Sequence, residues 1–285
     1  MVTDAASPGS ASAGGDPALF RARTACLILA LAACLPGLLQ LEFLWQHSEY
    51  LGHAYLIPLT AIYLAFLRRE VLAAALRSGR PGRFGVAAVF GAAALEAVAV
   101  VAQNGSIAGI GIPLLIGATA YAVAGPRLLR AALVSLLFLL LMVPPPPFLQ
   151  DRMLIGLKAL VVSVSVGILQ QLGFSIAASG NRIFVPQSEL LVADACSGLT
   201  SLVTLAPLAV VVAYFLSRGT WRRALVVLSA VPIAILGNVA RVIITVVLVS
   251  RFGVGYAEGL LHDSFGLATF VLGTGLLIGV ARSLR

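Results

Sequence analysis

A single cysteine stands where an irregular polar segment passes into a long apolar run. Residues 192–202 read Val-Ala-Asp-Ala-Cys-Ser-Gly-Leu-Thr-Ser-Leu, so that Cys196 follows Asp194 by two positions. Asp194 is a good N-cap, which places Cys196 near the first turn of a helix, where free backbone N–H groups and the helix dipole favour a thiolate. Such a thiolate can act as a nucleophile near neutral pH. For an isolated cysteine, the alternative is a packing role.

Two other ionisable residues are predicted to lie at the same membrane depth. Arg241 lies inside an apolar run, where an arginine costs about 2.5–3.5 kcal/mol to insert and so marks a candidate site; its alternative is snorkelling to the interface. His262 precedes the last apolar run, and its alternative is a structural hydrogen bond. With Cys196 as nucleophile, His262 as general base and acid, and Arg241 stabilising the oxyanion, the three predict acyl transfer through a thioester.

Three further residues are candidates for supporting roles. Asn238, one turn before Arg241, could orient the arginine or donate to the same oxyanion, or it could make an ordinary bond between helices. Asp194 and Ser197 accompany the cysteine in its motif. A metal site of Asp194, Cys196 and His262 is a weaker alternative, because the ligands lack the usual paired spacing. We therefore expect no metal and no organic cofactor.

The composition is that of a polytopic membrane protein. The 285 residues are 60% hydrophobic and only 11% charged, beyond what soluble domains show. The formal charge of +8 comes mainly from arginines in short segments between apolar runs, as the positive-inside rule produces, so no nucleic-acid partner is expected. Cys26 and Cys34 lie about 12 Å apart along one predicted helix, too far for a disulfide.

Eight apolar runs are long enough to cross a bilayer as helices, for which about 17–25 residues are needed. They comprise residues 24–41, 51–67, 84–102, 107–124, 127–143, 198–216, 224–249 and 263–281. A ninth segment, residues 153–172, contains Lys158 and two glutamines and is predicted to lie at the membrane surface instead.

The arginines decide the orientation and the placement of that ninth segment. A crossing by residues 153–172 would move the basic residues after position 217 to the outside, against the positive-inside rule. We therefore predict cytoplasmic N- and C-termini and an extracytoplasmic region 144–197. In this topology 14 of the 19 basic residues lie inside: Arg21, Arg23, Arg68, Arg69, Arg77, Arg80, Arg83, Arg127, Arg130, Arg218, Arg222, Arg223, Arg282 and Arg285.

The remaining segments complete the predicted fold class, an all-α polytopic membrane protein with eight transmembrane helices, an interfacial helix and a small β-like extracytoplasmic cap. Residues 1–20 are predicted to be a disordered cytoplasmic tail, and residues 21–285 one integral membrane domain. The four prolines 144–147 should end the fifth span. Gly180-Asn181, between short runs rich in Ile, Phe and Val, predicts a hairpin within the cap that leads to Cys196.

The ordered motifs resemble the exosortase and archaeosortase family of multi-spanning membrane proteins. The resemblance rests on residues 192–199, on Asn238-Val-Ala-Arg241, on His262 followed by Gly266, and on residues 52–58, Gly-His-Ala-Tyr-Leu-Ile-Pro. The family's Cys, Arg and His correspond to Cys196, Arg241 and His262. His53 corresponds to its N-terminal histidine, although here glycine precedes the histidine where the family pattern has one after it.

The resemblance implies a cysteine transpeptidase or protease in the bacterial inner membrane, with its active site facing the periplasm. Its partner would be the tripartite C-terminal sorting signal of exported proteins: a short motif, often Pro-Glu-Pro, then a transmembrane helix and a basic cluster. The new C-terminus would pass to water or to a surface acceptor, an amine or a lipid.

A transporter or channel-like protein with a structural cysteine is the alternative. Glu96 within the third apolar run and the glycine-rich residues 105–117 are features that can line a pathway.

Overall fold

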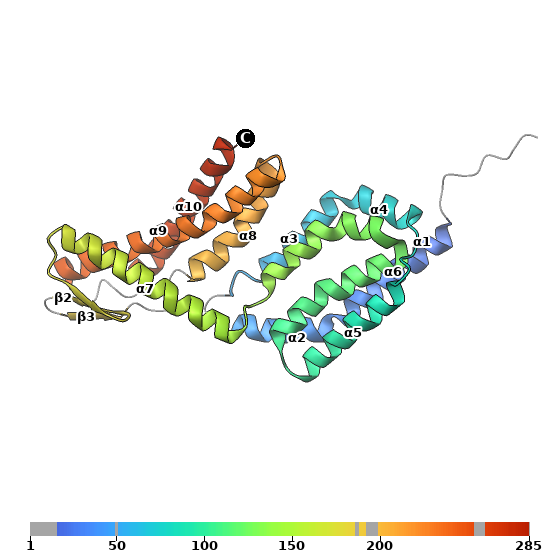
Figure 1. Cartoon of the computed structure of the whole chain (residues 1–285), viewed down its shortest axis with the longest axis horizontal. Helices are drawn as coiled ribbons and strands as arrows, with labels where there is room; N and C mark the ends of the chain where they lie inside the picture. The colour runs from blue at the N-terminus through green and yellow to red at the C-terminus, as the bar shows by residue number, and fades with distance from the viewer. Residues whose placement is uncertain (1–15, 49–50, 186–187, 192–198, 254–259, 285) are drawn as a thin grey trace, which may run out of the picture. The chain divides into compact units, whose positions relative to one another are not determined.

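The part of the chain that the structure describes is mostly helical, with one small sheet (Figure 1). The structure is a computed structural model that describes residues 16–48, 51–185, 188–191, 199–253 and 260–284, without the side chains of residues 188, 189, 191 and 260–263. Its contacts group the chain into two compact units. The N-terminal unit comprises residues 1–44 and 54–144, and the C-terminal unit comprises residues 45–53 and 145–285. The single domain predicted for residues 21–285 stays a prediction.

The N-terminal unit begins with a bent pair of helices, α1 (Pro17–Ala33) and α2 (Leu35–Gln46). Asp16 caps α1 by accepting a hydrogen bond from the Ala18 amide at 2.9 Å, and Pro17 occupies the first turn, where its missing N–H costs nothing. The helix therefore includes residues 17–20, which were expected to belong to a disordered tail; residues 1–15 lie outside the described chain. Cys26 and Cys34 are both free thiols, as predicted.

Two short helices follow: α3 (Leu56–Leu67) and α4 (Arg69–Ser78). No helix is predicted for the second of them, whose arginines mark only a cytoplasmic segment between two predicted spans. Its apolar residues recur at helical spacing, so that Ala75 and Leu76 pack against Ala120, Ala124 and Leu128 while the charged residues face outward.

Helix α5 (Gly85–Val101) precedes α6 (Gly105–Leu139), which continues as a 3₁₀ turn, η1 (Leu140–Met142). At Gly125 the backbone of α6 leaves the helical region, with φ 73° and ψ −161°, and Pro126 follows. A Cβ on Gly109 would lie 3.0 Å from Val143, and one on Gly117 would lie 3.2 Å from Leu136, so the two limbs run antiparallel. Figure 1 shows this reversal. The limbs correspond to the predicted runs 107–124 and 127–143.

The described helices are those of a polytopic membrane protein. By length and composition alone, five can cross a bilayer: Gly105–Met142, Pro147–Gln171, Leu199–Leu216, Thr220–Phe252 and Ser264–Ser283. The α1–α2 pair, bent by 41°, counts as a sixth if it forms one span, and α3 and α5 are apolar but shorter.

The C-terminal unit starts with α7 (Pro147–Gln171) and a small antiparallel sheet of β1 (Ala177–Ser179), β2 (Arg182–Val185) and β3 (Ser188–Leu191). The helix begins at the last of the four prolines, six residues earlier than expected, because a proline tolerates the first helical position. Ser179 pairs with Arg182, so the chain reverses at Gly180-Asn181, the predicted turn. The interfacial placement of residues 153–172 and the extracytoplasmic placement of the sheet stay predictions.

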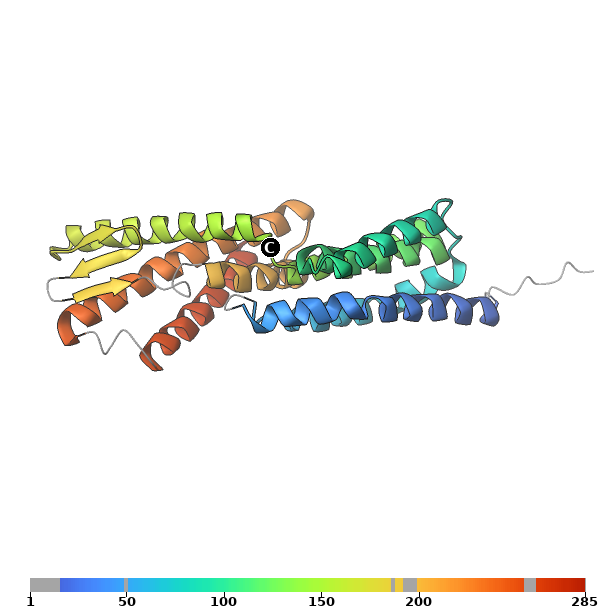
Figure 2. The ribbon, with the colours of Figure 1, turned by 90° about the horizontal axis from the view of Figure 1, so that it is seen from below.

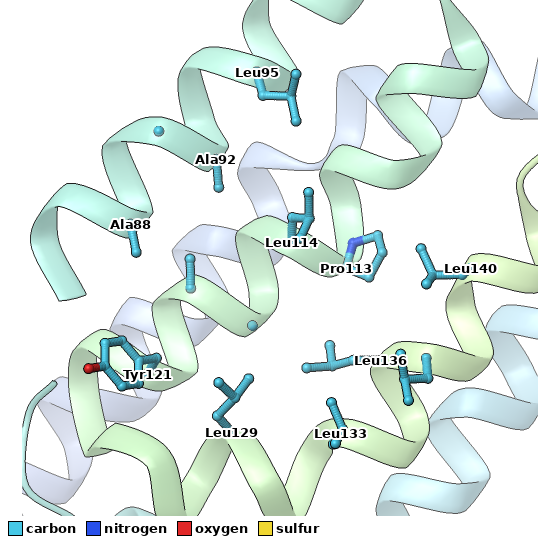
Figure 3. Close-up of a pocket in the computed structure, with 14 residues that line it drawn as sticks. Ala88, Ala92, Leu95, Pro113, Leu114, Tyr121, Leu129, Leu133, Leu136 and Leu140 are labelled. Carbon is cyan, nitrogen blue, oxygen red and sulfur yellow. The ribbon is translucent and has the colours of Figure 1, made fainter. Parts of the chain in front are cut away.

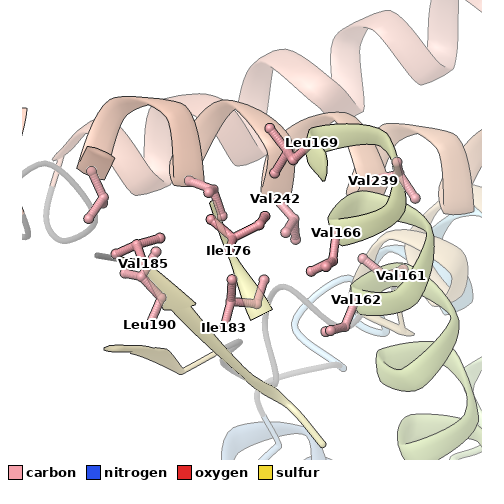
Figure 4. Close-up of a cluster of buried hydrophobic side chains, with 12 residues drawn as sticks. Val161, Val162, Val166, Leu169, Ile176, Ile183, Val185, Leu190, Val239 and Val242 are labelled. Atoms are coloured by element: carbon pink, nitrogen blue, oxygen red, sulfur yellow. The ribbon is translucent and has the colours of Figure 1, made fainter. Parts of the chain in front are cut away.

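Three long helices complete the unit: α8 (Leu199–Leu216), α9 (Thr220–Phe252) and α10 (Leu260–Ser283). The second half of α9 packs against α7 and the sheet through one apolar cluster (Figure 4). In that cluster Val239, Val242 and Val246 meet residues of α7, and Ile183, Val185 and Leu190 cover them from the sheet. Helix α9 thus carries an apolar surface along most of its length.

Glu96 of α5 is a buried carboxyl residue of the N-terminal unit. Its side chain is only 4% exposed. A Cβ on Gly37 of α2 would overlap its Oε1, and one on Gly111 of α6 would overlap its Oε2. Among the described residues neither oxygen has a hydrogen-bond partner. The two glycines therefore provide the space that this carboxyl group occupies.

We predict that Gly111→Ala lowers the free energy of unfolding by about 1–3 kcal/mol, because the new methyl group and the carboxyl group compete for one space. The same substitution should cost much less in a Glu96→Ala background. Gly91→Ala is the matched control, since its Cβ would meet nothing within 4 Å. Denaturant unfolding in detergent micelles measures all four variants. If Gly111→Ala lowers the free energy of unfolding equally in both backgrounds, competition with the Glu96 carboxyl group is not the cause of the loss.

Candidate functional site

The candidate site is built on the bundle of α8, α9 and α10, which packs in layers of small and branched apolar residues. One layer contains Leu205, Ala209, Ala230, Ala234 and Leu277. The next, toward the α8–α9 turn, contains Val212, Ala213, Val226 and Ala281. From the second layer to the first, residue numbers fall on α8 and α10 and rise on α9. Helix α9 therefore runs antiparallel to α8, as the short turn between them requires, and it also runs antiparallel to α10.

The register of the three helices brings Arg241, Gly266 and Leu199 to similar heights along the bundle axis. A Cβ on Gly273 of α10 would lie 3.4 Å from Ile233 of α9, and one on Gly237 would lie 3.9 Å from Thr269. Leu205 also lies 3.3 Å from the Cβ on Gly273, so Leu205, Ile233 and Gly273 share one level. Counted from that level, Arg241 lies about 12 Å further along α9, and Gly266 lies about 10 Å further in the same direction on α10. Leu199, the first described residue of α8, lies about 9 Å from Leu205 in the same direction, within one helical turn of the heights of Arg241 and Gly266.

The contact between Arg241 and α10 is direct. A Cβ on Gly266 would lie 3.4 Å from Nη2 and 3.5 Å from Nη1 of Arg241. The guanidinium group therefore packs against backbone at a position without a side chain. The motif around His262 includes Gly266 but predicts no role for it, and its i, i+4 spacing from His262 is the one signal in the sequence.

Arg241 is buried. The residue is 8% exposed, and its carbonyl accepts a hydrogen bond from Thr245 at 2.9 Å. Its neighbours Val239 and Val242 belong to the apolar cluster around α7. A snorkelling arginine would extend into water, so burial within the protein argues against that alternative.

Asn238 lies one turn before Arg241 and is 2% exposed. Its Nδ2 donates a hydrogen bond to the Ala234 carbonyl at 2.7 Å, within α9 itself. This bond satisfies part of a buried amide, as burial in an apolar bundle requires. The predicted role of Asn238 beside Arg241 stays a prediction.

The remaining predicted site residues are described only in part. Asp194, Cys196 and Ser197 lie outside the described ranges. The backbone of His262 lies in the first turn of α10, one turn before Gly266, whereas the sequence analysis expected it just ahead of the helix. His53 lies in the turn before α3 and is half-buried, and it belongs to the C-terminal unit, as do all the other predicted site residues.

No metal centre is apparent in the part of the chain that the structure describes, where no three His, Cys, Asp or Glu residues group together. The alternative metal site of Asp194, Cys196 and His262 falls on residues whose side chains are not described.

One cavity of the N-terminal unit has a mostly apolar lining. The cavity between α5 and the two limbs of α6 has a volume of about 540 Å³ (Figure 3). Leucine, alanine and glycine residues line most of it, with Pro113 and Tyr121. Its described lining includes no carboxylate, imidazole or thiol, and an apolar cavity of this kind suits hydrocarbon.

Comparison with known proteins identifies the family. No curated protein and no solved structure gives a significant match. Residues 45–279 match the family described as transmembrane exosortase. The matched region includes α8, α9 and most of α10 with the Arg241–Gly266 contact, and it also includes His53. This match extends over most of the chain, and the protein therefore belongs to the transmembrane exosortase family.

Proposed function

We propose that this exosortase is a cysteine peptidase or transpeptidase of the bacterial inner membrane, which cleaves the C-terminal sorting signal of exported proteins on the periplasmic side. The observation that carries the proposal is the contact of Arg241 with Gly266, with Leu199 within one helical turn of the same level. Three Cα–Cα steps of 3.8 Å limit the distance from the Leu199 Cα to the Cys196 Cα to about 11 Å. One helical turn, about 6 Å, separates the backbone of His262 from that of Gly266.

The chemistry follows from these residue types. The Cys196 thiolate attacks the carbonyl carbon of the scissile peptide bond, and the resulting oxyanion accepts hydrogen bonds from the Arg241 guanidinium. Collapse of this intermediate breaks the C–N bond and leaves a thioester, while the imidazolium of His262 gives its proton to the leaving amine. Water or an acceptor amine then attacks the thioester and releases the thiolate, with His262 taking the proton from the attacking group.

The length of α9 supports an outer location for the site. Its 33 residues extend about 50 Å, beyond the roughly 30 Å of a hydrocarbon core. If Arg222 and Arg223 mark the cytoplasmic boundary, Arg241 lies about 27 Å further along, at the opposite boundary. The rest of α9 would then stand outside, covered by α7 and the sheet.

We further propose eight spans with both termini in the cytoplasm: the α1–α2 pair, α3, α5, the two limbs of α6, α8, α9 and α10. In this arrangement α7 does not cross. Figure 1 shows α7 inclined to α9, which suits a helix that leaves the membrane surface and meets α9 at its outer half.

Accessibility of introduced cysteines tests this topology. In a variant without its three native cysteines, Ser179→Cys should react with a membrane-impermeant maleimide from the periplasmic side. Arg80→Cys and Arg218→Cys should react only after permeabilisation. Labelling of Arg218→Cys from outside would mean that α7 crosses the membrane and that the proposed topology is wrong.

The thiol is tested by processing of a co-produced exported protein that ends in a Pro-Glu-Pro motif, a transmembrane helix and a basic cluster. We expect Cys196→Ala to abolish its cleavage, because no other group supplies the nucleophile. Cys26→Ala, which alters an exposed cysteine of α1, is the control and should cleave normally. Immunoblotting measures the cleaved and intact substrate at equal enzyme levels.

Normal cleavage by Cys196→Ala would exclude the thiol mechanism. A transporter or channel with a structural cysteine would then be the preferred interpretation. The wild-type enzyme should also form a covalent adduct with the substrate that hydroxylamine releases, as expected for a thioester.

The Arg241–Gly266 contact gives a second test. Gly266→Ala should retain much of the cleavage, because its methyl group would reach only ordinary contact with the guanidinium. Gly266→Leu should displace the guanidinium and reduce the rate about 10²–10³-fold, the cost of losing one oxyanion donor. Gly275→Leu, on the same helix with nothing within 4 Å of its Cβ, is the control. Similar rates for both leucine variants would exclude Arg241 from this role.

A further inference from the structure

A second polar region lies in the N-terminal unit, far along the chain from the proposed catalytic residues. It is a hollow of about 810 Å³ between the α3–α4 junction and the second limb of α6. Three arginines line it, Arg68, Arg127 and Arg130, with Glu70 as the one carboxylate among its described lining residues. The lining therefore carries a net charge of about +2 at neutral pH.

Hydrogen bonds to backbone hold the walls of the hollow in place. Arg68 donates to the Ala131 carbonyl at 3.3 Å and so ties the α3–α4 junction to α6. The buried Arg23 of α1 donates to the Leu76 carbonyl and to the Gly79 carbonyl, the latter at 2.9 Å, and so fixes the end of α4. The hollow is thus part of the folded structure.

Arg127 and Arg130 are available for a ligand. They lie three residues apart on one face of α6, and both are exposed. Among the described residues neither forms a hydrogen bond or an ion pair. By contrast, Arg69 and Arg77 of α4 lie over the rings of Phe66 and Phe20, at 4.4 and 5.3 Å from the ring centroids. The positive-inside rule explains why arginines gather at this end of the helices, but it does not require them to line one hollow.

We propose that this hollow binds the phosphodiester headgroup of an anionic phospholipid. Two free guanidinium groups on adjacent turns match the paired acceptor oxygens of a phosphate. Val71, which is 60% exposed, Ala74 and Ala131 also line the hollow, so apolar surface for the glycerol and the first acyl carbons adjoins the charged groups. That combination favours a lipid over free phosphate. Basic pockets between helices on the cytoplasmic side are typical sites for such headgroups.

Binding of dioleoylphosphatidylglycerol to the purified full-length protein in detergent, followed by native mass spectrometry, tests the proposal. We expect Arg127→Gln/Arg130→Gln to raise the dissociation constant about 30-fold, which corresponds to about 1 kcal/mol for each arginine. Arg80→Gln/Arg282→Gln removes the same charge from exposed positions outside the hollow and should leave the constant unchanged. Dioleoylphosphatidylcholine should bind weakly to all three proteins.

Three results would overturn the proposal. An equal loss in both double variants would mean that only overall charge matters. Equal binding of the two lipids by the wild-type protein would remove the need for an anionic headgroup. Displacement of the lipid by millimolar inorganic phosphate would show that the hollow takes free phosphate instead. None of these outcomes bears on Cys196, so this proposal and the proposed enzymatic function are tested separately.

Discussion

Burial of the Arg241 guanidinium inside an apolar bundle is the constraint on which the candidate site depends. A guanidinium group stays charged at any physiological pH, so the helices around it must make room for it. Gly266 does so by leaving the facing surface of α10 bare, and the alanine-rich layers below hold the three helices close. The arginine consequently has a defined position, which a group that stabilises charge during a reaction requires.

The length of α9 explains why α7 and the small sheet pack against its second half. A helix of 33 residues with valines along its second half exposes more apolar surface than a bilayer of ordinary thickness covers. Helix α7 and the small sheet bury this surface in the cluster of Figure 4. In the proposed topology one helix therefore crosses the membrane, places Arg241 at its boundary and anchors the structure outside it.

In the N-terminal unit, too, glycines make room for a polar group and arginines bond to neighbouring helices. Gly37 and Gly111 make room for the Glu96 carboxyl group, and Gly125 allows α6 to reverse. Arginines that donate to backbone carbonyls tie α1 to the end of α4 and the α3–α4 junction to α6, while Arg127 and Arg130 are exposed. Small residues and guanidinium groups thus shape a unit that contains both a mostly apolar cavity and the arginine-lined hollow.

The sequence by itself determined the membrane class, most helix positions and the family, because long apolar runs, prolines and ordered motifs are local signals. It also located the turn at Gly180-Asn181. It missed α4 and the start of α7, where arginines and prolines obscured a helix that neighbouring residues stabilise. Only the tertiary structure decided that Gly266 faces Arg241 and that Glu96 lies between two glycines. Those contacts depend on which helices become neighbours and in what register, and no local pattern encodes that.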